Sequence, residues 1–206
     1  EALEAENESL KEQIANMEDA ARKADATERE NARLRNQLSF KETHETYDEV
    51  DAYIIGWSST DWSNTVTINR GSIEENMVAI TDVGEVVGLV TQVGANFAVV
   101  KTVLDSTLEI SATITTSGYN GMVSGGYIEG NEKFLQMDYL PSSSIIRNKD
   151  QVVTSGSTVY PRGLILGHVV DAGFKETGVA KYAVLQPAAD ISSLEQIFIV
   201  TNFQTE

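Results

Sequence analysis

The chain has 206 residues, and 41% of them are apolar, which is enough to bury a core. Its formal net charge of −16 opposes phosphate backbones and anionic lipid surfaces, so we expect no nucleic-acid partner. It has no cysteine, and its two histidines are far apart in the sequence, which excludes disulfides, thiol nucleophiles and zinc–thiolate sites. We therefore expect no metal site.

The chain contains no apolar run close to the roughly 20 residues that span a bilayer, and it begins with Glu1 instead of Met. We expect it to be a fragment of a longer protein. A membrane anchor or signal, if the intact protein has one, would lie upstream of this chain.

Residues 1–47 are predicted to form a long helix. Their first 40 residues contain no Pro and no Gly, and they are rich in residues that favour helices. Apolar and small residues recur every three or four positions, which defines a narrow seam. We assign dimerisation to its large members, Leu3, Leu10, Ile14, Met17, Leu34 and Leu38. So narrow a stripe favours a coiled coil, most simply a parallel homodimer, over a helix that lies on its own domain.

From Val50 onward the hydrophobic period changes to two. At least ten short β-branched or alternating runs are separated by Gly, Asn, Asp and Ser. No further helix of any length is predicted. Strands at this spacing point to small antiparallel barrels or sandwiches. We predict a mainly β fold, in which an N-terminal coiled-coil helix is followed by two small antiparallel β-barrels.

An internal repeat divides the β region. The segments GEVVGLVTQVG (84–94) and GLILGHVVDAG (163–173) keep three glycines in step, which suggests two barrels of like design, although chance recurrence is the alternative. Gly88 and Gly167 fall inside strands, where glycine costs stability unless a bend or a close backbone approach requires it. The structural glycines are Gly84, Gly88, Gly94, Gly163, Gly167 and Gly173.

The strand count suggests the domain boundaries. Residues 48–108 hold too few strands for a full barrel, so we expect residues 191–206 to return and complete it. Residues 109–190 would then form the second barrel. Residues 1–47 would be the dimerisation helix.

Two groups of aromatic residues are candidates for binding a partner. Trp57 and Trp62 either pack a hairpin or the junction after the helix, or anchor a partner. A glycine-rich segment, residues 117–141, either presents a partner surface or belongs to the core of the second barrel. Its candidate residues are Tyr119, Met122, Tyr127, Phe134 and Tyr139.

Several landmarks occur in an order that is similar to MreC, the family of rod shape-determining proteins of bacteria. They are ENARLRNQL, VDAYIIGWSSTDWSNTVTINRGS, GLVTQVGANFAVVKTVLD, SGYNGMVSGG, MDYLP, DQVVTSGSTVYPRGLILGHV and LQPAADISSLEQIFIV. Together they run from about residue 28 to residue 200.

The resemblance implies a protein anchored by one N-terminal membrane helix, which this chain lacks. Its part outside the cytoplasmic membrane would be a coiled coil followed by two barrels related to the chymotrypsin-like fold. It would be a noncatalytic scaffold of the cell-wall elongation machinery that controls cell shape and self-associates as a dimer or a higher assembly. Its partners would be MreD, MreB, RodA-type glycosyltransferases and penicillin-binding proteins. The resemblance supplies no catalytic residues.

Two other functions stay open from the sequence. A trypsin-like hydrolase would need His44 or His168 within reach of a serine and a carboxylate. Ser155 and Ser157 resemble a nucleophile loop, but a turn explains them better. A carbohydrate-binding or peptidoglycan-binding module would need a concave aromatic groove. No P-loop or dinucleotide fingerprint is present, so we expect no cofactor and no catalytic residue.

Overall fold

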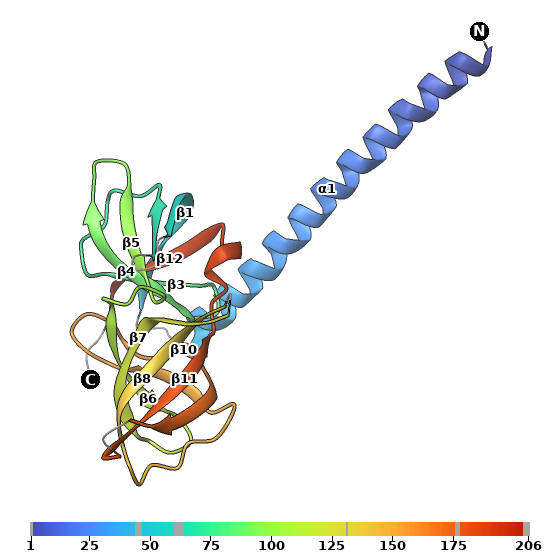
Figure 1. The fold of residues 1–206 in the computed structure, drawn as a ribbon. Coiled ribbons are helices and arrows are strands. Elements are labelled where there is room, and N and C mark those ends of the chain that lie inside the picture. Colours follow the sequence, from blue (N-terminus) through green and yellow to red (C-terminus); the bar gives the residue numbers. More distant parts are fainter. Residues whose placement is uncertain (1, 44–46, 60–63, 131, 176–177, 204–206) are drawn as a thin grey trace. The chain divides into compact units, whose positions relative to one another are not determined.

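The computed structural model describes residues 2–43, 47–59, 64–130, 132–175 and 178–203. Its contacts divide the chain into two units, Glu1–Thr43 and His44–Glu206. The first unit is a single helix, and the second contains two β-barrels (Figure 1). We describe each unit by itself.

Helix α1 runs from Ala2 to Thr43 and has 42 residues. At about 1.5 Å per residue it is roughly 60 Å long. Ion pairs one turn apart lie on its surface, such as Arg22 to Asp19 at 3.0 Å and Lys23 to Asp19 at 3.1 Å. Such exposed pairs add little stability. The helix is therefore sustained by the helix-favouring composition of this segment rather than by its ion pairs.

The first barrel is closed by six antiparallel strands in the order β1-β12-β3-β4-β5-β2. These strands are β1 (Asp48–Ser59), β2 (Asn64–Ile68), β3 (Val78–Ile80), β4 (Val86–Val93), β5 (Ala98–Thr102) and β12 (Gln196–Asn202). The C-terminal strand β12 pairs with both β1 and β3. Closure therefore depends on a strand that is about 90 residues beyond β5 in the sequence.

The second barrel is closed by six antiparallel strands in the order β10-β11-β8-β7-β6-β9. These strands are β6 (Glu109–Ile114), β7 (Asn120–Glu129), β8 (Glu132–Pro141), β9 (Gln151–Ser155), β10 (Arg162–Phe174) and β11 (Ala180–Pro187). A short 3-10 helix, η1 (Ile191–Ser193), lies between β11 and β12. The prediction of a mainly β chain with two small antiparallel barrels is confirmed.

The interior of each barrel is filled by every second side chain along its strands. Strands β2 and β5 bury every second residue, and so does β9. Ile68, Val100 and Ile197 are fully buried in the first barrel, as are Leu135 and Leu185 in the second. Because strand side chains alternate with a period of two, a closed barrel directs one half of them inward and the other half outward.

The two strands that carry the glycine repeat, β4 and β10, approach their neighbours in the same way. A Cβ added at Gly88 would lie 2.0 Å from the backbone oxygen of Lys101, and one added at Gly167 would lie 2.2 Å from that of Gln186. The first glycines of the two repeats, Gly84 and Gly163, both have positive φ, at 83° and 92°. Both strands therefore need glycine for backbone contact and turn geometry.

The third glycines of the repeat also match. A Cβ at Gly94 would lie 2.3 Å from the ring of Phe97, and one at Gly173 would lie 2.8 Å from the hydroxyl of Tyr182. In each barrel the strand carrying the repeat lies between the strand before it and the strand after it. The shared sequence pattern thus corresponds to a shared local structure.

A buried polar network fixes the crossover between the barrels. Asp105, only 1% exposed, accepts hydrogen bonds from the backbone of Asn64 at 3.0 Å and of Thr107 at 2.9 Å. Lys133, on β8 of the second barrel, donates to Oδ1 of Asn64 at 2.7 Å. The side chain of Asn64 therefore links the first barrel to the second. The backbone adds a further link, because Ile165 donates to the carbonyl of Gly84 at 3.1 Å.

The hydrogen bonds to Asp105 change its titration. Burial alone would raise the pKa of Asp105, but the hydrogen bonds from Thr107 and Asn64, with Lys101 nearby, outweigh burial and hold the pKa below its ordinary value. The ionised carboxylate therefore stabilises the fold above the unfolded-state pKa of about 3.9. This stabilisation is lost as the pH falls through the lower, folded-state pKa.

We predict that Gly88→Ala lowers the free energy of unfolding by roughly 1–3 kcal/mol, because the new methyl group would overlap a backbone carbonyl. Gly56→Ala is the matched control, since a Cβ there would meet only Thr67, at 3.6 Å. Urea unfolding followed by circular dichroism measures both variants. Equal stability of the two variants would contradict the close approach of β4 and β5.

We predict that Asp105→Asn costs roughly 2 kcal/mol at neutral pH, since hydrogen bonds to an ionised group are lost. The difference from the unchanged chain should shrink as the pH falls from about 4, where the carboxylate of the unfolded chain takes up a proton, through the lower pKa of the folded state. Urea unfolding at a series of pH values tests this. Asp171→Asn, at an exposed position on β10, is the control. A difference that stays constant across the series would show that the charge contributes nothing.

Candidate functional site

Strand β1 carries a row of exposed apolar side chains on its outer face. Tyr53, Ile55 and Trp57 are 49%, 61% and 50% exposed, whereas Ala52 on the opposite face is 1% exposed. We call these three residues the β1 row. Soluble proteins rarely leave adjacent large apolar side chains exposed without a binding role. Trp57 was a sequence candidate. Tyr53 and Ile55 were missed, although the alternation in DAYIIGW places them on the same face.

The β1 row ends at a hollow between the two barrels. This inter-barrel hollow has a volume of about 600 Å³, and Trp57 lines it. Leu104 and Lys133 line it as well, together with residues 186–192, which run from the end of β11 into η1. Its walls are mostly apolar with a few charged groups, which is typical of binding sites of this size. A partner lying along the β1 row could thus insert a side chain between the barrels.

Electrostatics within the hollow come mainly from Lys133 and Asp190. Asp190 accepts hydrogen bonds from the hydroxyl of Ser192 at 2.6 Å and from its backbone N–H at 3.3 Å. These bonds, with a contribution from Ser193, lower the pKa of Asp190. The carboxylate thereby caps η1, and Lys133 is tied to Asn64. The polar rim of the hollow is therefore fixed in place before anything binds.

The aromatic candidates in residues 117–141 do not form one surface. Phe134 is 9% exposed and packs edge to face on Tyr127, with ring centroids 6.4 Å apart, so this pair belongs to the second barrel itself. Met122 is partly buried, and its sulfur accepts a hydrogen bond from Ser111. Tyr119 is half-buried at a separate, smaller hollow.

Tyr139 differs from the other aromatic candidates because it is 74% exposed and has a positive φ of 65°. It lies where the register between β8 and β11 shifts, between Met137, which pairs with Ala183, and Leu140, which pairs with Lys181. A bulky residue in this conformation is uncommon, and bulges of this kind redirect a side chain outward. The remaining aromatic candidate, Trp62, lies outside the described residues.

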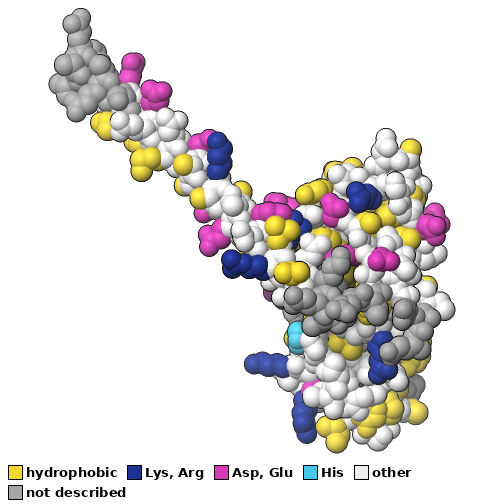
Figure 2. Space-filling model, turned by 180° about the vertical axis from the view of Figure 1, so that it is seen from behind, with side chains coloured by type: hydrophobic (Ala, Val, Ile, Leu, Met, Phe, Trp, Pro, Cys, Tyr) yellow, Lys and Arg dark blue, Asp and Glu magenta, His cyan; other side chains and the backbone are white. Residues whose placement is uncertain are grey.

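The seam of α1 is exposed along the helix. Leu10, Ile14 and Met17 are 52%, 54% and 72% exposed, and Leu34 and Leu38 are 49% and 61% exposed. Hydrophobic side chains are visible along the helix in Figure 2. The side chain of Leu3 lies outside the described part of the chain.

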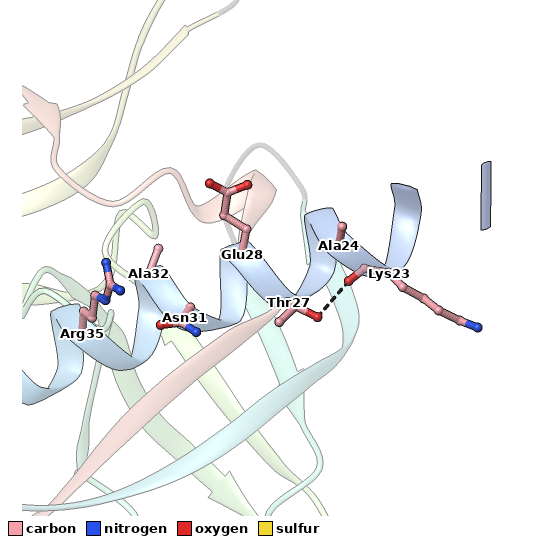
Figure 3. A pocket seen from close by; sticks show the side chains of 7 residues that line it. All are labelled: Lys23, Ala24, Thr27, Glu28, Asn31, Ala32 and Arg35. Atoms are coloured by element: carbon pink, nitrogen blue, oxygen red, sulfur yellow. Dashed lines mark hydrogen bonds between the residues drawn. The ribbon is translucent and has the colours of Figure 1, made fainter. Parts of the chain in front are cut away.

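The helix surface has a shallow depression between the two groups of large seam residues. Figure 3 shows this depression, whose lining residues are Lys23, Ala24, Thr27, Glu28, Asn31, Ala32 and Arg35. The hydroxyl of Thr27 turns back and donates to the carbonyl of Lys23 at 2.8 Å. Small and back-bonded side chains leave room there for a second helix to approach closely.

The groups that a hydrolase would need are not assembled in the described residues. His168 is exposed on β10, and no hydrogen bond joins it to a serine there. The hydroxyl oxygen of Ser157 accepts from the backbone of Val159 at 3.0 Å and of Tyr160 at 3.2 Å, as expected for a turn. His44 lies outside the described residues.

Other chemistry has equally little support within the described residues. Burial raises the pKa of Glu85 and the nearby charge of Asp82 adds to this, while the hydrogen bond from Thr81 and the nearby His168 act in the opposite direction. No group of three or more His, Asp or Glu side chains there could hold a metal ion. None of the described helices has the length and apolar character required to cross a membrane.

Comparisons with known proteins agree with this arrangement. The family model described as rod shape-determining protein MreC, barrel core, matches residues 54–201. The cell shape-determining protein MreC of Bacillus subtilis (strain 168) is 29% identical over an alignment of 206 positions, gaps included. This alignment covers 95% of this chain and 71% of that protein.

Solved structures share the fold. MreC from Listeria monocytogenes has a TM-score of 0.69 at 24% identity and covers 97% of this chain and 99% of its own. A structure described as a complex between penicillin-binding protein PBP2 and MreC from Helicobacter pylori has a TM-score of 0.59 at 17% identity, covering 75% of this chain and 98% of that one. Since the family model covers well over half of its length, the chain belongs to the MreC family of cell shape-determining proteins.

Proposed function

We propose that this chain is a noncatalytic scaffold of the cell-wall elongation machinery, which pairs with itself through α1 and binds peptidoglycan-synthesis proteins through its barrels. The observation that carries the proposal is the presence of two separate sets of exposed apolar side chains. One is the seam of α1, and the other is the β1 row beside the inter-barrel hollow. Each set suits a different kind of partner.

Self-association is assigned to the seam. Its large residues from Leu10 to Leu38 are about half exposed or more, and exposed residues at spacings of three and four are typical of helices that pair. Two such seams would bury each other, at roughly 25 cal/mol for each Å² removed from water. Polar Asn31 would lower stability but favour one register. We therefore propose that the chain forms a homodimer or a higher assembly of the same chain.

Binding of unlike partners is assigned to the barrels. The β1 row offers aromatic anchors, and the adjoining hollow offers a partly apolar pocket with a fixed polar rim. The MreC of the Helicobacter pylori structure forms a complex with a penicillin-binding protein, which supports the same class of partner here. MreD, MreB and RodA-type glycosyltransferases are proposed as further partners on the family resemblance alone.

The scaffold is proposed to act on the outer side of the cytoplasmic membrane, held by a single-pass anchor in the intact protein. A noncatalytic role is supported by the occupied hydroxyl of Ser157 and by the isolation of His168 from any described serine. The competing hydrolase function would need these groups to be brought together. The competing carbohydrate-binding function would use the β1 row as its aromatic surface.

We predict that replacing Ile14 and Leu34 together by Ser makes the chain monomeric, because each change removes an apolar layer worth on the order of 1–3 kcal/mol per chain. Sedimentation equilibrium at micromolar concentration measures the mass. The same variant should still capture a penicillin-binding protein in a pull-down, with lower apparent affinity because the second copy no longer adds avidity.

The matched control replaces Glu12 and Arg29 by Ser, two exposed residues of α1 outside the seam. This control should stay dimeric. A seam variant that keeps the mass of a dimer would place the interface elsewhere. A monomeric seam variant that captures no partner would show that the helix, and not only the barrels, carries recognition.

A further inference from the structure

A second hollow lies at one end of the second barrel and shares no residue with the inter-barrel hollow. Its volume is about 280 Å³. Thr116, Ser117 and Tyr119 line it from the connection between β6 and β7. Ile145, Arg147 and Asp150 line it from the connection between β8 and β9. A hollow of this size suits a small chemical group more than a drug-sized ligand.

The two walls of this hollow are joined by a buried carboxylate. Asp150, 8% exposed, accepts a hydrogen bond at Oδ1 from the hydroxyl of Thr116 at 2.6 Å and at Oδ2 from the backbone N–H of Arg147 at 2.8 Å. The backbone N–H of Asp150 donates in turn to the carbonyl of Arg147 at 3.1 Å. The hollow is therefore preorganised, because the carboxylate of Asp150 in one wall holds the hydroxyl of Thr116 in the other.

Arg147 brings an available positive charge to the hollow. Its side chain is exposed, and no carboxylate in the described part of the chain forms an ion pair with it. Two lysines of the same barrel differ, because Lys175 pairs with Asp138 at 2.7 Å and Lys181 donates to the carbonyl of Ser144 at 2.7 Å. A guanidinium presents two parallel N–H groups that match the two oxygens of a carboxylate.

The rest of the lining selects among anions. Asp150 places a negative charge beside the hollow, which opposes a dianion such as phosphate more strongly than a carboxylate with a single charge. Ile145, 65% exposed, and the ring of Tyr119 offer apolar surface next to Arg147. The ligand that fits therefore combines one carboxylate with an apolar group a few atoms away.

We propose that this hollow, the Arg147 hollow, binds a free carboxylate next to an apolar side chain, and that the ligand is the C-terminal end of a peptide. A C-terminal residue carries its carboxylate and its side chain on the same carbon, which is compact enough for the available volume. An acidic side chain beside an apolar residue shares this chemistry, so the experiment separates these two sources. The inference does not depend on the scaffold function.

The test is an NMR titration of the whole chain, in which backbone amide resonances report the position of binding. N-acetyl-leucine should shift the amides of residues 116–119 and 145–150. N-acetyl-leucinamide, which lacks the charge, and inorganic phosphate should bind at least about tenfold more weakly. N-acetyl-leucyl-glutamate amide, whose only carboxylate is in a side chain, should also bind more weakly than N-acetyl-leucine.

Two variants of one residue and a neighbouring control complete the test. Arg147→Gln should weaken N-acetyl-leucine binding by about tenfold or more. Arg147→Lys should weaken it by less, since the positive charge is kept but the two parallel N–H groups of the guanidinium are lost. Lys149→Gln, an exposed cation two positions away that does not line the hollow, should change the affinity less than about twofold. Unchanged resonances elsewhere in each spectrum show that the variant is folded.

Several outcomes would overturn the proposal. Absence of shifts at any soluble concentration of N-acetyl-leucine would show that the hollow does not bind it. Equal binding of the leucinamide or of phosphate would remove the selectivity for a carboxylate. An unchanged affinity in Arg147→Gln would exclude the guanidinium as the binding group. Tighter binding of the leucyl-glutamate amide would assign the hollow to an acidic side chain instead of a C-terminus.

Discussion

Closure of the two barrels depends on close backbone contact at glycines, among them Gly88 in the first barrel and Gly167 in the second. At Gly88 and Gly167 the neighbouring strand's carbonyl oxygen occupies the place where a side chain would begin. No other residue allows that approach without moving a strand. Once closed, a barrel has no free sheet edge, and its inward side chains form the core. Function is therefore left to the outward faces, to the connections between strands and to the segments that join the barrels.

Those remaining surfaces carry apolar groups that the fold itself does not need. The β1 row lies on the outside of the first barrel, and the inter-barrel hollow is lined by both segments that cross between barrels. The polar network around Asp105 and Asn64 holds one crossover in place. A site built on two barrels in this way keeps its shape only while the barrels remain joined. The helix, by contrast, exposes a seam that another helix can cover.

The sequence predicted the features that follow from period and from glycine. The change of period near residue 47 separated helix from strands, and the two repeats marked strands that meet their neighbours in the same way. Surface features were harder to predict, because exposure depends on which face of a strand the barrel turns outward. In the sequence, Tyr53 and Ile55 look like ordinary strand residues, and nothing there shows that both are exposed. Phe134 could not be distinguished from a surface aromatic residue until its packing on Tyr127 was known. The Arg147 hollow combines two connections that lie almost 30 residues apart, so no local pattern reveals it.

We propose that recognition of unlike partners lies on the barrel surface and is separable from helix pairing. The most direct measurement is the affinity of immobilised penicillin-binding protein for the chain in which Tyr53 and Trp57 are replaced by Ser, compared with Phe97→Ala, which removes another exposed aromatic side chain of the first barrel. Loss of two aromatic anchors should weaken capture by about tenfold or more, while sedimentation still shows the mass of a dimer. Capture at the same affinity as the Phe97 control would show that recognition does not lie on the β1 row.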